Sequence, residues 1–444
     1  MKDPRYIRLA NMLSDAIRDG KLPPGTKLPT HRAFAEQANV ALATATRVYG
    51  EVERRGLIVG EAGRGTFVRD LGLPPTLGIH QRDTDDLIDL VFNMPGEDAD
   101  ADILRAGLRR LAAAGDLEAM LRYQPHGGRT HERSIMAESL APTLGVIAPD
   151  TLLVTSGGQH GLAITALGLF KHGDAIAADT LTYPGFKSIA ALHGLDLVPV
   201  QGNKGVMDPD DLSRQCQARK LSAVYLMPTV HSPLGTVMDT ATRLQLIKVA
   251  RKYDLLIIED AAYAFLEPDP PPSLISLAPE RTIYIGGFSK SIATGLRLGY
   301  VVSPTHYVDL LLEAIRATTW NAPALISSLV TGWIEEGTLV RSEVNRRMDG
   351  AERQHICRSV MKGLTVLSHP NAGFAWMSLE KGLRSEPIVT ELKKRGISAS
   401  GAEPFATTTA VPQALRLAFG GVQKERLKSV FQTVRETIEA ASVV

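Results

Sequence analysis

The sequence predicts an α/β protein with an N-terminal winged helix-turn-helix, a large domain around a mostly parallel sheet, and a small α+β domain. At the N-terminus, three helical patterns precede a short hairpin with a glycine-rich tip. Further along, continuous apolar runs alternate with helical patterns, which is typical of a parallel sheet covered by helices on both faces. We expect the winged helix at residues 1–70, a linker at 71–88, the large domain at 89–326 and the small domain at 327–444.

The length and composition indicate several folded domains rather than one. The chain has 444 residues, of which 44% are hydrophobic and 22% charged, as packed soluble domains require. The net charge of +1 is unevenly divided: residues 1–70 carry 12 basic and 8 acidic side chains, and the remainder carries 37 and 40. The positive end is the one that nucleic-acid phosphates would attract, but a surplus of this size needs a motif to support it.

The N-terminal domain is predicted from its helix signals and its turns. Gly20 ends the first run of apolar residues at helical spacing, and Thr30 can cap the second helix through its hydroxyl. Two short β-type runs flank the glycine-rich tip of a hairpin. The expected elements are helices at residues 5–19, 31–38 and 42–55 and strands at 57–59 and 66–68.

The two C-terminal domains are predicted from their apolar runs. Such runs alternate with helical patterns up to about Ser327, and then a helix leads into a smaller mixed unit. The large domain is expected to have strands at residues 152–154, 175–177, 223–226, 255–258 and 282–285, and the small domain at 374–379 and 414–419.

The sequence indicates neither export, nor a membrane span, nor a metal site. Cys216 and Cys357 are far apart and lack paired spacing, which fits a reducing cytoplasm. His126 and His131 have no third ligand near them in the sequence. The N-terminus is polar, and no run approaches the roughly twenty apolar residues of a membrane span. We expect a cytoplasmic protein that binds no metal and no membrane.

A group of four residues predicts a site for pyridoxal phosphate (PLP). Lys290 follows Asp260 by thirty residues, with Ser289 before it and Arg297 shortly after. This cofactor needs an amine to hold its aldehyde as a Schiff base and a carboxylate to keep its pyridine nitrogen protonated. Its phosphate needs cationic and hydroxyl donors. The four residues supply all of these groups.

From Leu90 onward the chain resembles the fold-type I, aspartate-aminotransferase-like PLP enzymes, which implies roles for single residues. Lys290 would hold the cofactor, Asp260 would pair with its pyridinium nitrogen, and Tyr263 would donate a hydrogen bond to its phenolic oxygen. Tyr183 would stack on the ring. Tyr123 would reach the phosphate in the neighbouring subunit, which requires a homodimer.

The resemblance also implies a phosphate cup and a carboxylate site. Arg416, in Leu-Arg-Leu-Ala-Phe, matches the arginine that grips a substrate α-carboxylate. Ser232 departs from the family, because Ser-Pro-Leu-Gly stands where Asn-Pro-x-Gly is usual; its shorter hydroxyl replaces an amide donor to the phenolic oxygen. The phosphate would be held by Ser289, Arg297 and the backbone of a glycine turn that opens a helix, formed by Gly157, Gly158 and Gln159.

Residues 3–69 resemble the GntR-type winged helix. The resemblance rests on Leu-Pro-Pro-Gly-Thr-Lys-Leu-Pro at 22–29, Thr44-x-x-Arg47-x-Tyr49, and Gly-Arg-Gly-Thr-Phe-Val at 63–68. It departs at Ala41-Leu42, where the family often has Ser-Arg. In such folds the recognition helix enters the major groove and the wing reaches the minor groove. The expected DNA contacts are Arg32, Thr44, Thr46 and Arg47 in the major groove and Arg64 with Gly65 at the wing.

In this order, the two resemblances identify the chain as a member of the MocR subfamily of GntR regulators. They imply a transcriptional regulator that binds PLP, a double-stranded DNA operator, and an amino acid or amine effector that displaces Lys290 as an external aldimine. They also imply a head-to-tail, domain-swapped homodimer. Two alternatives stay open: an active aminotransferase with an auxiliary winged helix, and a sensor of PLP itself.

Overall fold

The N-terminal domain is three helices followed by a hairpin, as the sequence predicts. Thr30 caps the second helix by accepting a hydrogen bond from the Ala33 N–H, and Val48 and Val52 of the third helix are fully buried in the core. The hairpin strands are antiparallel, with Ile58 opposite Val68. The elements are α1 (Arg5–Arg18), α2 (His31–Gln37), α3 (Leu42–Arg54), β1 (Ile58–Glu61) and β2 (Gly65–Val68).

The computed structural model describes residues 4–18, 21–23, 25–61, 65–68, 87–94, 100–113 and 117–442. Arg64 and most of the expected linker, residues 71–86, lie outside this part. The described chain resumes just before a short strand, β3 (Ile88–Asp89), which pairs in parallel with β15 (Ile397–Ser398) of the small domain.

The large domain contains a seven-stranded sheet. All neighbouring strands are parallel except for β12, which is antiparallel to both of its neighbours. The mostly parallel sheet that the sequence predicts is therefore present. In spatial order the strands are β4 (Leu152–Thr155), β12 (Gly299–Val302), β11 (Thr282–Gly287), β10 (Leu256–Asp260), β9 (Ala223–Leu226), β5 (Ala175–Asp179) and β6 (Asp196–Val200).

Helices cover both faces of this sheet. One apolar cluster joins the strands to α7 (Gly158–Leu169), α8 (Pro184–His193) and α12 (Val308–Thr318). Two further clusters cover the other face with α6 (Thr130–Leu144), α9 (Pro209–Ala218), α10 (Thr240–Tyr253), α11 (Leu274–Leu277) and α13 (Ala324–Glu335). Because both faces are buried, the strands are continuous apolar runs. The remaining helices before the sheet are α4 (Asp100–Ala113) and α5 (Leu117–Met120).

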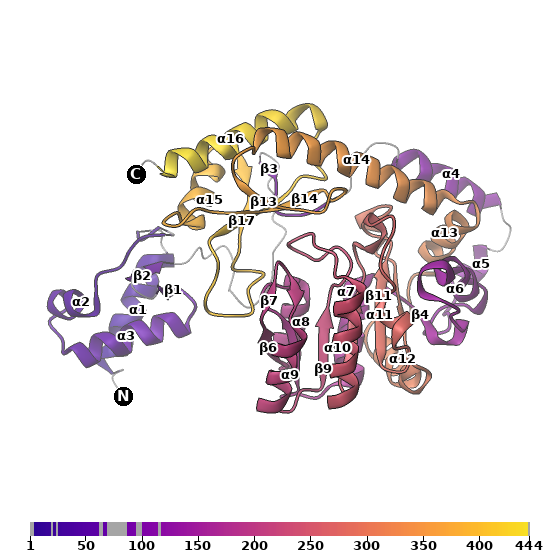
Figure 1. Cartoon of the computed structure of the whole chain (residues 1–444), viewed down its shortest axis with the longest axis horizontal. Coiled ribbons are helices and arrows are strands. Elements are labelled where there is room, and N and C mark those ends of the chain that lie inside the picture. Colours follow the sequence, from indigo (N-terminus) through magenta and orange to yellow (C-terminus); the bar gives the residue numbers. More distant parts are fainter. Residues whose placement is uncertain are drawn as a thin grey trace.

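The small domain is a four-stranded antiparallel sheet with three long helices. Its strands are, in spatial order, β13 (Thr365–Leu367), β14 (Phe374–Ser378), β17 (Ala414–Ala418) and β16 (Ser400–Gly401). Its helices are α14 (Thr338–Val360), α15 (Ser385–Lys394) and α16 (Lys424–Ser442). Figure 1 shows α14 running from the small domain toward α4 and α13 of the large domain.

The winged helix contacts the start of α15 in the small domain. The guanidinium carbon of Arg384 lies 3.5 Å from the centre of the Phe67 ring. A Cβ added at Gly25 would lie 3.2 Å from Cγ of Pro387. The winged helix thus lies beside the small domain (Figure 1). No helix within the described ranges is long and apolar enough to cross a membrane.

Candidate cofactor site and nucleic-acid interface

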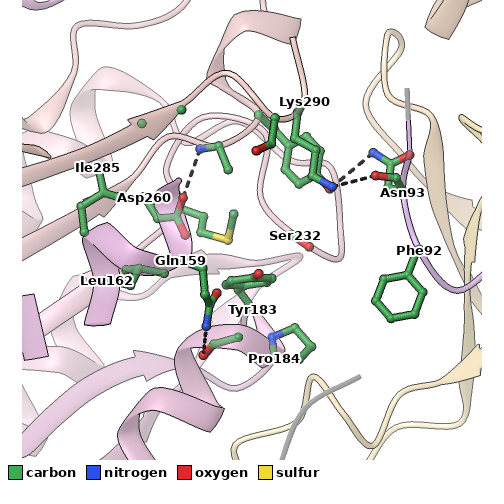
Figure 2. A pocket seen from close by; sticks show the side chains of 18 of the residues that line it. Phe92, Asn93, Gln159, Leu162, Tyr183, Pro184, Ser232, Asp260, Ile285 and Lys290 are labelled. Atoms are coloured by element: carbon green, nitrogen blue, oxygen red, sulfur yellow. Dashed lines mark hydrogen bonds between the residues drawn. The ribbon is translucent and has the colours of Figure 1, made fainter. Parts of the chain in front are cut away.

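A cavity of about 370 Å³ opens at the carboxyl ends of the large-domain strands, where the small domain faces them (Figure 2). Ligands in open α/β sheets bind outside the carboxyl ends of the strands. Ten of the predicted site residues line it: Gly158, Gln159, Tyr183, Ser232, Asp260, Tyr263, Ser289, Lys290, Arg297 and Arg416. The structure therefore brings together residues that are up to 258 positions apart in the sequence.

Asp260 is the last residue of β10 and is 4% exposed. Its Oδ2 accepts a hydrogen bond of 2.7 Å from the Tyr225 hydroxyl, and its Oδ1 accepts one of 3.1 Å from the Ala262 N–H. Burial raises the pKa of this carboxyl, and the two donors oppose that shift. A cationic ring nitrogen beside Asp260 would further favour the carboxylate.

Lys290 faces the segment that follows β3, the strand that pairs with the small domain. Its Nζ donates a hydrogen bond of 2.7 Å to the Asn93 carbonyl, and the Asn93 amide donates one of 3.3 Å to the Tyr263 hydroxyl (Figure 2). Burial acts to raise the pKa of Tyr263, but the charges of Lys290 and Arg416 outweigh it and the pKa is lowered. The Tyr263 hydroxyl thus lies near two cations. Such surroundings suit a group that donates a hydrogen bond to an anionic oxygen.

The glycine turn after β4 forms a cradle at the start of α7. Gly157 has φ 91°, and a Cβ there would lie 3.0 Å from Nη2 of Arg297. Arg297 in turn donates a hydrogen bond of 3.3 Å to the Ser289 hydroxyl. The first turn of a helix leaves backbone N–H groups without intrahelical acceptors, and its dipole favours an anion. Gly157 does not itself line the cavity but gives Arg297 the space to reach it.

Tyr183 and Ser232 lie in the same cavity wall (Figure 2). Tyr183 precedes α8, and burial raises the pKa of its phenol, so it is a neutral aromatic surface. Ser232 is 3% exposed. Its hydroxyl is the short side chain that replaces the amide of the family pattern.

Arg416 enters the cavity from β17 of the small domain and is 4% exposed. Its Nη1 donates a hydrogen bond of 2.6 Å to the Val91 carbonyl, while its Nε has no hydrogen-bond partner in the described part of the chain. Burial lowers the pKa of this guanidinium. A buried cation with a free donor is suited to bind a carboxylate.

The cavity fits PLP because several donors and acceptors in its wall have no hydrogen-bond partner within the described part of the protein. Three buried atoms in its wall lack hydrogen-bond partners among the residues that the structure describes: Asn93 Oδ1, Gln159 Oε1 and Arg416 Nε. Buried polar atoms without partners are rare in folded proteins and point to a bound group. With the amine of Lys290, the carboxylate of Asp260 and the phosphate cradle, the wall offers the groups that this cofactor needs.

Tyr123 is the one predicted cofactor contact that lies well away from this cavity. Its side chain is 85% exposed, and its ring centre is 5.5 Å from that of Trp320, which is 45% exposed. Within a single chain, Tyr123 therefore lies on the surface.

The sequence does not predict two of the site residues, Tyr225 and Asn93. Tyr225 has a weak signal, because it is a polar residue near the carboxyl end of an apolar strand. It lies opposite Ile258 in the parallel pair, and Ile258 and Asp260 share one face of their strand. Asn93 has no local signal, since it is 197 positions from Lys290.

The predicted DNA contacts gather on α2, α3 and the start of β2. Arg32, Thr46, Arg47 and Gly65 are exposed, whereas Thr44 is partly buried. The Thr46 hydroxyl donates to the Leu42 carbonyl at 3.1 Å and lies 3.3 Å from Nδ1 of His31. The helix-turn-helix thus presents two arginines and a row of small side chains.

Comparison with known proteins identifies both parts of the chain. Residues 85–434 match the family described as aminotransferase class I and II, and residues 5–68 match the bacterial regulatory proteins of the gntR family. An uncharacterized HTH-type transcriptional regulator, YdeF of Bacillus subtilis, is 29% identical over 411 residues, which are 92% of this chain and 88% of the relative. The probable rhizopine catabolism regulatory protein MocR of Rhizobium meliloti is 23% identical and covers 98% of this chain and 94% of its own length.

A solved structure shows the same fold. The α-aminoadipate aminotransferase LysN of Thermus thermophilus, complexed with N-(5'-phosphopyridoxyl)-L-leucine, aligns with a TM-score of 0.74 at 22% identity, over 82% of this chain and 96% of that one. The C-terminal part of this chain therefore has the fold-type I architecture, and its cofactor is PLP.

Proposed function

We propose that this chain, which belongs to the class I and II aminotransferase family and carries the N-terminal gntR domain of the MocR subfamily, senses an amino acid or amine through PLP and regulates transcription. The observation that carries the proposal is the shared cavity of Lys290, Asp260 and Arg416 in a chain that also has a DNA-binding domain. The effector and the DNA would bind two separate domains. An effector that shifts the protein between two states can therefore alter its affinity for DNA.

The effector site is supported by the geometry around Lys290. PLP supplies an aldehyde that exchanges one amine for another. An amino compound would take the place of Lys290, whose Nζ lies 2.7 Å from the Asn93 carbonyl, a ready acceptor for the released amine. Arg416 would bind the ligand's carboxylate, and its buried Nε is a donor without a partner among the described residues. An amino acid is thus the effector that uses both groups, and an amine is one that uses Lys290 alone.

The coupling to DNA is supported by where the two ligand-binding residues come from. Asp260 belongs to the large domain, whereas Arg416 belongs to the small domain. A ligand bound between them would favour one relative position of the two domains. The small domain also carries Arg384, which packs on Phe67 of the winged helix. Movement of the small domain would therefore be transmitted to the winged helix through this contact.

A homodimer is supported by the exposed aromatic pair of Tyr123 and Trp320. Large exposed aromatic side chains are enriched in interfaces. In a head-to-tail dimer in the cytoplasm, Tyr123 would contact the phosphate in the partner's site. The two winged helices would then read two half-sites of one operator.

An active aminotransferase is the second candidate, and a specific observation favours it. The cavity wall contains the whole set of Lys290, Asp260, Tyr263 and Arg416. Ser232 favours the regulator, because the shorter hydroxyl weakens a contact that tunes proton transfer in the family.

The test is an absorbance titration of the PLP-loaded protein with amino acids and amines, run beside DNA binding to the region upstream of its own gene. The proposal predicts that one compound changes both the cofactor absorbance and the DNA affinity without forming a keto acid. Rapid conversion to the pyridoxamine form with unchanged DNA affinity would identify an aminotransferase. If DNA affinity differs between PLP-free and PLP-loaded protein but no amino acid or amine alters it, the protein is a sensor of PLP.

A further inference from the structure

The recognition helix α3 begins with apolar side chains that face solvent. Leu42, its first residue, is 46% exposed, and Ala41 and Ala43 on either side are exposed as well. Ala41 occupies the N-cap and forms no side-chain hydrogen bond there. By contrast, α2 begins at Thr30, whose hydroxyl caps the helix. The start of α3 is therefore not built for helix capping.

Packing in the domain core does not explain why a leucine stands at position 42. The buried residues of α3 are Ala45, Val48, Tyr49 and Val52. The apolar core of the winged helix is formed around three of these with residues of α1 and the hairpin, and Leu42 is not part of it. A large aliphatic side chain that is half exposed and outside the core is free to contact a partner.

The polar groups near Leu42 are already engaged within the protein. The Thr46 hydroxyl donates to the Leu42 carbonyl at 3.1 Å, so that it can accept from Nδ1 of His31 at 3.3 Å. Thr46 is exposed, and with its hydroxyl engaged its methyl group is what it can offer a partner. The Tyr49 hydroxyl donates to the Pro29 carbonyl at 2.7 Å. The surface at the start of α3 is thus apolar in its chemistry as well as in its composition.

Cations lie beside this apolar surface. Arg32 and Arg47 are exposed, and neither side chain has a hydrogen-bond or ion-pair partner within the described ranges. Arg47 stands more than one helical turn after Leu42. Such a pair can hold DNA phosphates on either side of the groove while the first turn of α3 meets the base edges.

We propose that Leu42 and Ala43 make α3 a reader of thymine, by packing against 5-methyl groups in the major groove. This inference rests on the proposed function, since it requires that the winged helix binds DNA. Of the four bases, thymine alone presents a methyl group in the major groove. Adenine, guanine and cytosine present hydrogen-bonding groups but no methyl group there, and Leu42 and Ala43 would desolvate those groups without a partner. The half-site that faces the start of α3 therefore contains A·T pairs.

The test uses the full-length protein and removes only the methyl group. A preferred duplex is selected from random DNA, and each thymine in it is replaced in turn by deoxyuridine, which keeps all base-pairing groups. We expect at least one replacement per half-site to weaken binding by the wild-type protein about three- to fivefold, the effect of burying one methyl group. In Leu42→Ala at least one of these replacements, at the thymine that contacts Leu42, no longer has an effect.

A control variant distinguishes recognition of thymine by Leu42 from general DNA binding. Met12→Ala removes another exposed aliphatic side chain, 68% exposed, from α1 of the same domain, and this variant keeps the wild-type response to deoxyuridine. If no deoxyuridine replacement changes the wild-type affinity, or if Leu42→Ala responds like the wild type, recognition of thymine by Leu42 is overturned. The proposed regulator is then unaffected. A protein that binds no duplex overturns both this reading and the proposed regulator.

Discussion

The Tyr225 hydroxyl donates a hydrogen bond of 2.7 Å to the Asp260 carboxylate. Tyr225 is fully buried, and the Phe186 ring stacks on it with ring centres 4.0 Å apart. Burial raises the pKa of the Asp260 carboxyl, and the hydrogen bond from Tyr225 opposes that shift. Tyr225 is therefore a positioning residue that favours the carboxylate form of Asp260 and orients it for the cofactor.

Tyr225→Phe is expected to weaken PLP binding about tenfold, as is usual for the loss of a hydrogen bond to a charged group. Titration of the PLP-free protein, followed by cofactor absorbance, measures this directly. Tyr284→Phe is the matched control, since Tyr284 is a buried residue on β11 of the same sheet and its hydroxyl has no hydrogen bond in the described part of the chain. Equal losses in both variants would contradict the role of Tyr225.

Arg416→Lys keeps the positive charge but removes the planar fork that binds a carboxylate with two hydrogen bonds. We expect the affinity for an amino acid effector to fall about tenfold or more, and that for the corresponding decarboxylated amine to change less than about twofold. Absorbance titrations with the two compounds measure the difference. If both affinities fell equally, Arg416 would not be the carboxylate site.

Glu259 provides a pH test of the large domain. It is 1% exposed and accepts hydrogen bonds from the Leu274 and Ile275 N–H groups. Burial nevertheless raises the pKa of its carboxyl to about 7, from an ordinary value of 4.5. Between these two pH values the folded state holds a proton that the unfolded state has lost, so the stability from this group falls as pH rises.

Glu259→Gln should remove that part of the pH dependence. From pH 5 to pH 8, the free energy of unfolding of the wild type should fall by up to about 3 kcal/mol more than that of the variant. Urea denaturation at the two pH values measures the difference. Glu313→Gln, at a side chain that is 68% exposed, serves as control. Parallel pH profiles of wild type and Glu259→Gln would show that Glu259 is already ionised at pH 5.

Arg384→Ala tests the contact between the small domain and the winged helix. The change removes the guanidinium that lies 3.5 Å from the Phe67 ring centre. We expect the effector to alter cofactor absorbance as before but to change DNA affinity much less, because the two domains are uncoupled. Arg395→Ala, at the other end of α15, is the control and should respond as the wild type does. A full DNA response in Arg384→Ala would place the coupling elsewhere.

Much of this architecture follows from local sequence signals. Continuous apolar runs identify the buried strands, and Thr30 marks the start of α2 as predicted. The order of Asp260, Lys290 and Arg297 identifies the cofactor, because its chemistry requires those groups. Local signals cannot identify the contacts of Asn93 with Lys290 or of Phe67 with Arg384, since these pairs meet only through tertiary packing. Tyr225 lies between these cases, because its role depends on the register between β9 and β10.

In the proposed function, ligand exchange at Lys290 controls DNA binding. The most direct measurement is the DNA affinity of PLP-loaded wild-type and Lys290→Ala proteins, with and without the amino compound that changes the wild-type absorbance. We expect the compound to change the DNA affinity of the wild type, and Lys290→Ala to bind DNA without responding to it. An equal response of the two proteins would show that the effector acts without displacing Lys290.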